Sequence, residues 1–266
     1  MGVTVAAIID DLVAEQDDLD SIVAALSDTQ WELPTPSPRW AIHDQIGHLA
    51  FFDETAALAI ADPAAFITHR EEFVAAAFAN AGASDELTLG LARSMSAEQL
   101  FSRWRRARSD LAEAAGGCAD DSRIEWYGPS MGAKSFLTAR LMECWAHGQD
   151  ICDAAGAVRQ PTDRLRHIAQ LGFITRRWTY INRKAEMPPG DVHVALDAAS
   201  GARWTWGPDT AEASVRGPAV DFCLVTAQRR NVADTKLVVT GDIADDWMAK
   251  AQLFAGPPSN PPRPIA

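Results

Sequence analysis

Apolar residues recur every three or four positions through most of the first 182 residues, which is the pattern of helices with one buried face. Ser96 and Gln99 form a capping box at the start of one such segment, and Pro63 opens another. The pattern predicts a helical bundle with additional short helices. The predicted helices span residues 4–28, 42–60, 63–80, 85–93, 96–115, 132–155 and 162–182.

The pattern changes after Pro188-Pro189-Gly190, where hydrophobic and polar residues begin to alternate as they do in half-buried strands. The elements predicted beyond this point are strands at 192–196, 202–206 and 213–215, a buried strand at 237–240, and helices at 219–229 and 243–254. We therefore expect three parts along the chain. These are a helical bundle over 1–185, a small α+β domain over 186–255 and a Pro-rich tail over 256–266.

Composition and charge narrow the class of protein. The chain has 266 residues, of which 47% are hydrophobic, and a formal net charge of −12. This acidic balance argues against nucleic acid and membrane partners, because both need a basic protein surface. The acidic N-terminus lacks the basic start of a signal peptide, and the four cysteines lack Cys-x-x-Cys spacing. We expect a cytoplasmic monomer or homodimer that binds small molecules.

The candidate chemistry lies in the stretch Arg140-Leu-Met-Glu143-Cys-Trp-Ala-His147-Gly-Gln-Asp150. Glu143 and His147 are four residues apart on one predicted helix, so both project from the same face and can bind one metal ion. His48, on the helix predicted at 42–60, is the best candidate for a third ligand. Two histidines and one glutamate are a ligand set of catalytic zinc. Two alternatives need no metal: a solvated helix face, or a hydrogen bond between Glu143 and His147.

Two segments resemble the mycothiol-dependent maleylpyruvate isomerase family, which belongs to the DinB-like superfamily of metal-binding four-helix bundles. The segment Trp40 to Leu49 resembles the first-ligand motif, in which a Trp opens a helix that carries a His-Leu pair. The segment Glu143 to Asp150 resembles the second motif, a Glu and a His four apart followed by Gly-x-Asp. The resemblance implies a mainly α fold, an up-down four-helix bundle followed by a small α+β domain. It also implies that the metal ligands are His48, Glu143 and His147.

The resemblance further implies zinc as the metal and mycothiol as a thiol cosubstrate. Zinc lowers the pKa of a bound thiol, so the thiolate exists at neutral pH. Such a thiolate can add to an unsaturated acid and leave again, as in an isomerase, or stay attached, as in an S-transferase. The alternative is a non-catalytic metal-binding or stress-related protein of the same fold. The stretch 222–230 differs from what we expect of the isomerase, which leaves the substrate open.

Several other residues are candidates for supporting roles. The resemblance places an active-site arginine at Arg229, with Arg230 as the second choice, although cations are also favoured at a helix C-terminus for structural reasons. Asp44 and Asp150 lie about one turn from a candidate ligand histidine and could orient its ring. Ala41 stands where Ser or Thr usually caps a helix, so we expect that helix to fray at its start.

Overall fold

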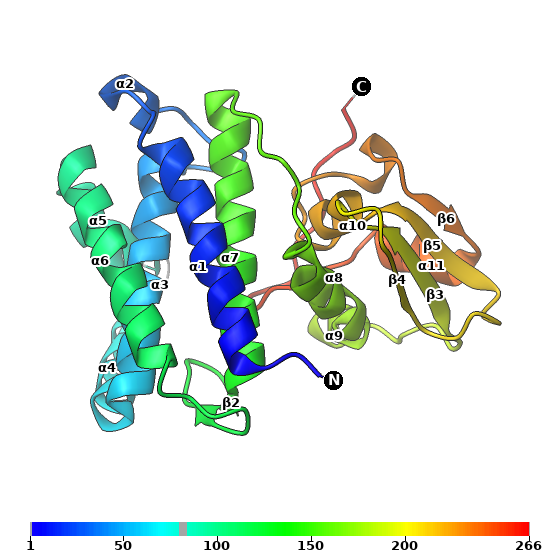
Figure 1. The fold of residues 1–266 in the computed structure, drawn as a ribbon, viewed down its shortest axis with the longest axis horizontal. Helices are drawn as coiled ribbons and strands as arrows, with labels where there is room; N and C mark the ends of the chain where they lie inside the picture. Colours follow the sequence, from blue (N-terminus) through cyan, green and yellow to red (C-terminus); the bar gives the residue numbers. More distant parts are fainter. Residues whose placement is uncertain (1, 80–83, 266) are drawn as a thin grey trace. The chain divides into compact units, whose positions relative to one another are not determined.

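The computed structural model describes residues 2–79 and 84–265 (Figure 1). Contacts between Cα atoms divide the chain into two compact units, Met1–Val158 and Arg159–Ala266. The boundary therefore falls before the last predicted bundle helix, whereas the sequence analysis placed it at 185/186. That helix belongs to the second unit and packs against other elements of it. A Cβ added to its Gly172 would lie 2.9 Å from the Phe222 ring, which shows how closely the two backbones approach.

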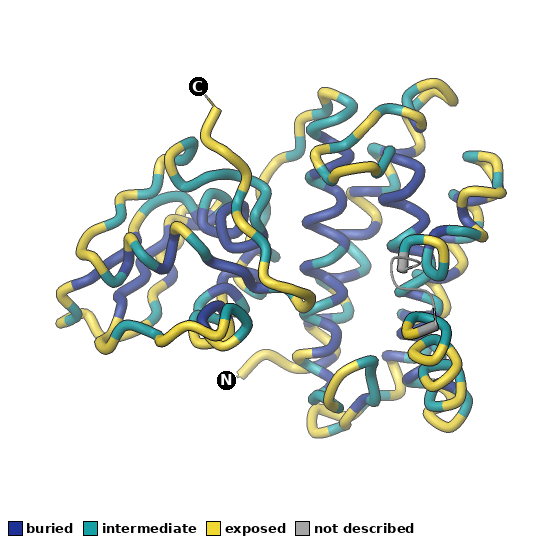
Figure 2. The backbone as a smooth tube through the Cα atoms, turned by 180° about the vertical axis from the view of Figure 1, so that it is seen from behind, coloured by how far each residue is buried: buried dark blue, intermediate teal, exposed yellow. Residues whose placement is uncertain are grey.

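The first unit is mainly helical, as expected. Its long helices α1, α3, α6 and α7 form a four-helix bundle and bury their apolar faces against one another (Figure 2). Leu19, Ile46 and Trp104 are among the fully buried side chains of this core. The elements of the unit are α1 (Val5–Val23), α2 (Asp28–Trp31), α3 (Ile42–Ala61), α4 (Pro63–Ala79), α5 (Ser84–Arg93), α6 (Ala97–Ala115), β1 (Arg123–Ile124), β2 (Met131–Gly132) and α7 (Ala133–Ala155).

The direction of the helices differs in one respect from a simple up-down bundle. His43 at the start of α3 contacts the carbonyl of Met95 just before α6, and Asp53 farther along α3 contacts Trp104 in α6. These two helices therefore run parallel, because α4 and α5 carry the chain back to the end of the bundle where α3 begins (Figure 1). Helix α7 runs antiparallel to α3, and α1 runs antiparallel to α6.

Two helix ends differ from the sequence prediction for local reasons. The helix predicted over 4–28 ends at Val23, because Ser27 begins a new turn in which its backbone N–H donates to the Gln30 side chain at 3.0 Å. The start of α3 does not fray at Ala41. The carboxylate of Asp44 accepts the Ala41 N–H at 3.0 Å, and Ala41 also forms a β-bridge with Pro34. A side chain inside the helix thus replaces the missing cap.

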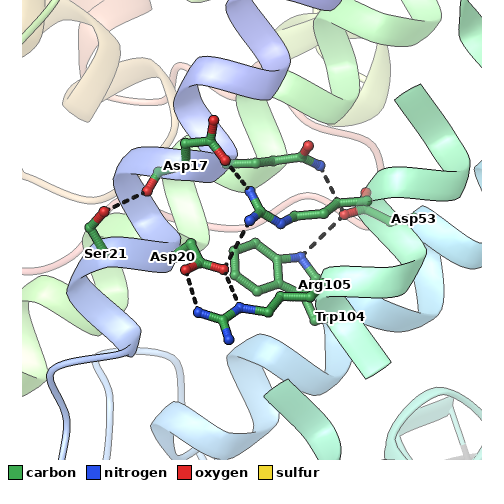
Figure 3. Close-up of polar contacts among 8 residues, drawn as sticks. Asp17, Asp20, Ser21, Asp53, Trp104 and Arg105 are labelled. Atoms are coloured by element: carbon green, nitrogen blue, oxygen red, sulfur yellow. Dashed lines mark hydrogen bonds and ion pairs between the residues drawn. The ribbon is translucent and has the colours of Figure 1, made fainter. Parts of the chain in front are cut away.

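A polar network joins three helices of the bundle (Figure 3). Asp53 is buried, and its Oδ2 accepts hydrogen bonds from Gln16 at 3.1 Å and from the Trp104 indole at 3.3 Å. Nearer the surface, Asp20 of α1 accepts two hydrogen bonds from Arg105 of α6, each at 2.7 Å. Paired bonds of this kind fix the register of α1 against α6.

The second unit contains a four-stranded sheet with the order β4-β3-β5-β6. The central pair β3 and β5 is parallel, and the two outer pairs are antiparallel. Its elements are α8 (Leu165–Ile174), α9 (Arg176–Asn182), β3 (Val192–Asp197), β4 (Arg203–Trp206), β5 (Ala213–Pro218), α10 (Ala219–Thr226), the 3₁₀ turn η1 (Val232–Asp234), β6 (Val238–Thr240) and α11 (Asp242–Met248). The predicted α+β character is therefore present.

Three predicted elements of this unit need correction. The helix expected at 162–182 is divided at Thr175, whose hydroxyl donates to the Leu171 carbonyl at 2.8 Å, a bond that often bends helices. The strand expected to be buried is an edge strand, and Val238 in it is 61% exposed. The helix expected at 243–254 ends at Met248.

Across the ranges that the structure describes, no helix combines the length and apolarity that crossing a bilayer requires.

Candidate metal centre

Helices α3 and α7 bring His48, Glu143 and His147 together inside the first unit. One ligand atom from each residue lies within 4.8 Å of the others. This cluster joins residues almost a hundred positions apart, and it contains all three of the predicted metal ligands. The side chains are largely buried, with exposed fractions of 17% for His48, 23% for Glu143 and 10% for His147. Each of the three side chains thus keeps a small part of its surface in contact with solvent.

The spacing of the three side chains suits a metal ion. The same oxygen of Glu143, Oε2, lies 3.0 Å from Nε2 of His147 and 3.5 Å from Nε2 of His48. Ligands placed tetrahedrally at ordinary zinc distances are about 3.3 Å apart. A metal ion thus needs only small side-chain shifts to enter. Two imidazole nitrogens and one carboxylate oxygen would leave a fourth position for a small ligand.

A chain of hydrogen bonds fixes which nitrogen of His147 carries the proton. The Thr35 hydroxyl donates to the Trp40 carbonyl at 2.9 Å, so its oxygen is available to accept the Gln45 amide N–H at 2.8 Å. This orientation turns Oε1 of Gln45 toward Nδ1 of His147, at 2.5 Å. Nδ1 must then be a donor. Nε2, which lies 3.0 Å from Oε2 of Glu143, is the nitrogen available to a metal ion.

The ionisation of the other two residues also suits a metal site. Burial, together with the nearby His147, lowers the pKa of His48 to about 4, so its imidazole is neutral at neutral pH. Burial alone would raise the pKa of Glu143. The contacts of its carboxylate with both imidazoles outweigh that effect and hold the pKa well below its ordinary value of 4.5. The cluster therefore presents a neutral imidazole at His48 and a carboxylate at Glu143 to a metal ion.

Comparison with known proteins places this site in a family. The model of the mycothiol maleylpyruvate isomerase N-terminal domain matches residues 12–152, which include all three residues of the cluster. The chain belongs to the mycothiol maleylpyruvate isomerase family. The match covers more than half of the chain and ends within α7, close to the end of the first unit.

Individual relatives extend this result along the chain. An uncharacterized protein of Mycobacterium tuberculosis, present in two strains, is 43% identical over 249 residues, which are 93% of this chain and 95% of the relative. A crystal structure of a mutant mycothiol-dependent maleylpyruvate isomerase has a TM-score of 0.59 at 16% identity and covers 91% of this chain and 94% of that one. A second structure of the isomerase has a TM-score of 0.57 at 16% identity, covering 85% and 90%. The solved structures establish that both units share the isomerase fold.

The residues that orient the histidines in this family member differ from those we expected. Asp44 does not contact a ring; its carboxylate caps α3 and accepts Arg93 at 2.7 Å. Asp150 lies 3.8 Å from Nδ1 of His147 and accepts the Ser37 hydroxyl at 3.1 Å, so it is a more distant neighbour. The direct partner is Gln45, which the sequence analysis missed. Its signal was a Gln on the apolar face of the helix, three residues before His48.

Two further candidates lie elsewhere. Arg229 belongs to the second unit, just after α10, and its Nη1 donates to the Ala227 carbonyl at 2.8 Å. Its role in the family's chemistry stays a prediction, as does that of Arg230. Cys144, which follows Glu143 in α7, is 2% exposed and lies in the hydrophobic core of the bundle. Its thiol is therefore part of the apolar packing of the bundle and not of the cluster.

Proposed function

We propose that this chain is a zinc-dependent enzyme that uses mycothiol to act on a small unsaturated or electrophilic acid, as an isomerase or an S-transferase. The observation that carries the proposal is the His48, Glu143 and His147 cluster, in which Gln45 binds Nδ1 of His147 and Nε2 of the same ring lies beside the Glu143 carboxylate. Family membership supports the thiol, because mycothiol is named in the family itself.

The three residues fit a zinc ion in their chemistry. Two imidazoles and one carboxylate are nitrogen and oxygen ligands that suit a divalent cation, and the buried Gln45 amide holds one ring in place. When bound, zinc supplies a Lewis acid that lowers the pKa of a thiol. Glu143 shares one oxygen with both histidines, so it holds the two rings at a common point.

The aromatic side chains around the cluster limit what can enter it. The Trp40 ring lies 5.2 Å from the His48 ring and 5.9 Å from the His147 ring, between centroids. The Phe52 ring also lies close to the His48 ring, at 4.6 Å between centroids. These rings exclude water from the metal ligands and offer flat apolar contacts to a planar substrate, such as an acid with conjugated double bonds.

The compartment and the second unit complete the proposal. The four cysteines are free in the structure, which fits the reducing cytoplasm where low-molecular-weight thiols are abundant. We place the enzyme there. We also propose that Arg229 binds an anionic group of the substrate or the thiol, as the family resemblance implies, since an arginine fork pairs well with a carboxylate.

Turnover with purified mycothiol tests the proposal. Wild-type protein loaded with zinc is incubated with maleylpyruvate and, separately, with an electrophile that forms a stable thioether, and the products are followed by chromatography. We expect thiol-dependent product from one of the two substrates, none without mycothiol, and none with His147→Ala. His69→Ala is the matched control. His69 does not belong to the cluster, and its Nε2 is hydrogen-bonded to the Tyr127 hydroxyl at 2.8 Å. Metal binding without turnover of any electrophile would support the non-catalytic alternative.

A further inference from the structure

Arg140 is a buried cation that lacks a partner for part of its guanidinium. The residue is 5% exposed, and its Nη1 has no hydrogen-bond partner in the part of the chain that the structure describes. An arginine cannot lose its charge in a protein, so burial without compensation is costly. Buried arginines normally pair with a carboxylate. The planar fork of donors of a guanidinium also matches the geometry of a carboxylate ligand.

The surroundings of this guanidinium are aromatic. Its central carbon lies 5.6 Å from the centre of the Phe52 ring and 6.0 Å from that of Trp126. Cation–π contacts of this kind offset part of the cost of burial but leave the N–H groups unsatisfied. The planar rings also provide an apolar lining for the carbon skeleton of a small acid.

Glu143 and Asp53 are the two carboxylates whose charges interact with that of Arg140, and both have other hydrogen-bond partners. Oε2 of Glu143 faces the two histidines of the cluster. Oδ2 of Asp53 accepts the hydrogen bonds of Gln16 and Trp104. The charge of Arg140 interacts with both carboxylates, but no ion pair joins it to either within the described residues. The fork of donors therefore faces no carboxylate of the protein at bonding distance.

We propose that Arg140 binds the carboxylate of the unsaturated acid on which the enzyme acts. Arg140 and Glu143 are three residues apart on α7, so their Cβ atoms are about 5–6 Å apart on the same face. Phe52 contacts both the guanidinium and the His48 ring. A carboxylate bound at Arg140 thus places the adjoining double bond beside the metal ligands. This assignment rests on the proposed function and names the part of the substrate that the site recognises.

Titration calorimetry with maleate and with its uncharged analogue maleamide, both without mycothiol, tests the assignment. We expect zinc-loaded wild-type protein to bind maleate and to bind maleamide about 10- to 100-fold more weakly, the range for a hydrogen-bonded charge. Arg140→Met should remove this preference while zinc content is unchanged. Arg140→Lys should retain part of it. Arg103→Met is the matched control, because Arg103 is also largely buried but pairs with Glu54 at 2.6 Å.

The possible outcomes separate this assignment from its competitors. Equal binding of maleate by Arg140→Met and wild type overturns it and makes Arg140 a structural cation near Asp53. Binding that survives Arg140→Met but is lost in His147→Ala also overturns it, because the acid then binds at the metal ligands. If Arg140→Met does not fold, the affinity of Arg140→Lys for maleate decides. It is measured by the quenching of Trp126 fluorescence on addition of maleate, and an affinity equal to that of wild type contradicts the proposal. Arg140-dependent binding without mycothiol turnover would reject the proposed reaction but retain this carboxylate site.

Discussion

The amide oxygen of Gln45 lies 2.5 Å from Nδ1 of His147, across the interface between α3 and α7. Gln45 is fully buried, and its amide nitrogen is held by Thr35. This contact couples His147 to the extended segment that precedes α3. The Thr35 hydroxyl in turn donates to the Trp40 carbonyl, so the ring of His147 is fixed by a chain of bonds that ends at the helix start.

Gln45→Leu should weaken zinc binding about 10- to 100-fold, because the substitution removes the acceptor that binds Nδ1 of His147 and orients its ring. Competition with a zinc chelator measures the affinity. Gln16→Leu is the control: Gln16 is equally buried but bonds to Asp53 in another part of the bundle. Equal affinities of Gln45→Leu and wild type would show that the ring is oriented by something else.

His48→Ala and His147→Ala should each abolish stoichiometric zinc binding and leave the bundle folded. Each substitution removes one ligand of the cluster, while the apolar core of α1, α3, α6 and α7 is unchanged. Zinc content after dialysis and far-ultraviolet circular dichroism check the two halves of this prediction. A folded His147→Ala protein that still carries a full equivalent of zinc contradicts the assignment of the ligands.

The sequence predicted the three residues that meet in the cluster but not the residues that support them. Helical spacing alone places Glu143 and His147 on one face of a helix, and the family motif adds His48. Gln45 and Arg140 could not be assigned in the same way, because their roles depend on the packing of α3 against α7. The boundary between the units was missed for a similar reason: the last helix pattern is amphipathic, and periodicity does not say which core that face joins.

Asp53→Asn should change how stability depends on pH. Burial raises the pKa of Asp53 from 3.8 to about 6 in the folded protein. A raised pKa favours folding below pH 3.8, and this contribution is lost as pH rises through about 6. Two pKa units correspond to about 3 kcal/mol. The free energy of unfolding of wild type relative to Asp53→Asn should therefore fall by up to that amount between pH 4 and 7.

Urea unfolding at several pH values measures this difference. The comparison with Asp53→Asn is needed because other carboxylates titrate in the same range and affect both proteins equally. The asparagine oxygen can still accept the bonds from Gln16 and Trp104, so the fold should be retained. A stability difference that does not change between pH 4 and 7 would mean that Asp53 ionises normally.

Asp20→Asn should lower the free energy of unfolding by about 1–2 kcal/mol at neutral pH, because charge-assisted hydrogen bonds to two arginines are weakened. Hydrogen bonds from Arg105, with the charge of Arg108, lower the pKa of Asp20. The carboxylate therefore stabilises the folded state above its ordinary pKa of 3.8 and loses this effect as pH falls below it. Urea denaturation at pH 7 and pH 3 measures the difference, with exposed Asp121→Asn as the control. Equal losses of stability at both pH values would contradict an ionic contribution.

The zinc content of purified, tag-free protein tests most directly the claim that the cluster binds zinc. It is measured by plasma mass spectrometry after equilibration with one equivalent of each common divalent metal. The His48, Glu143 and His147 cluster predicts close to one zinc per chain in wild type and in His69→Ala, and almost none in His147→Ala. Wild-type protein that retains no metal would contradict the account, and the cluster would then be a hydrogen-bonded group in the core of the bundle.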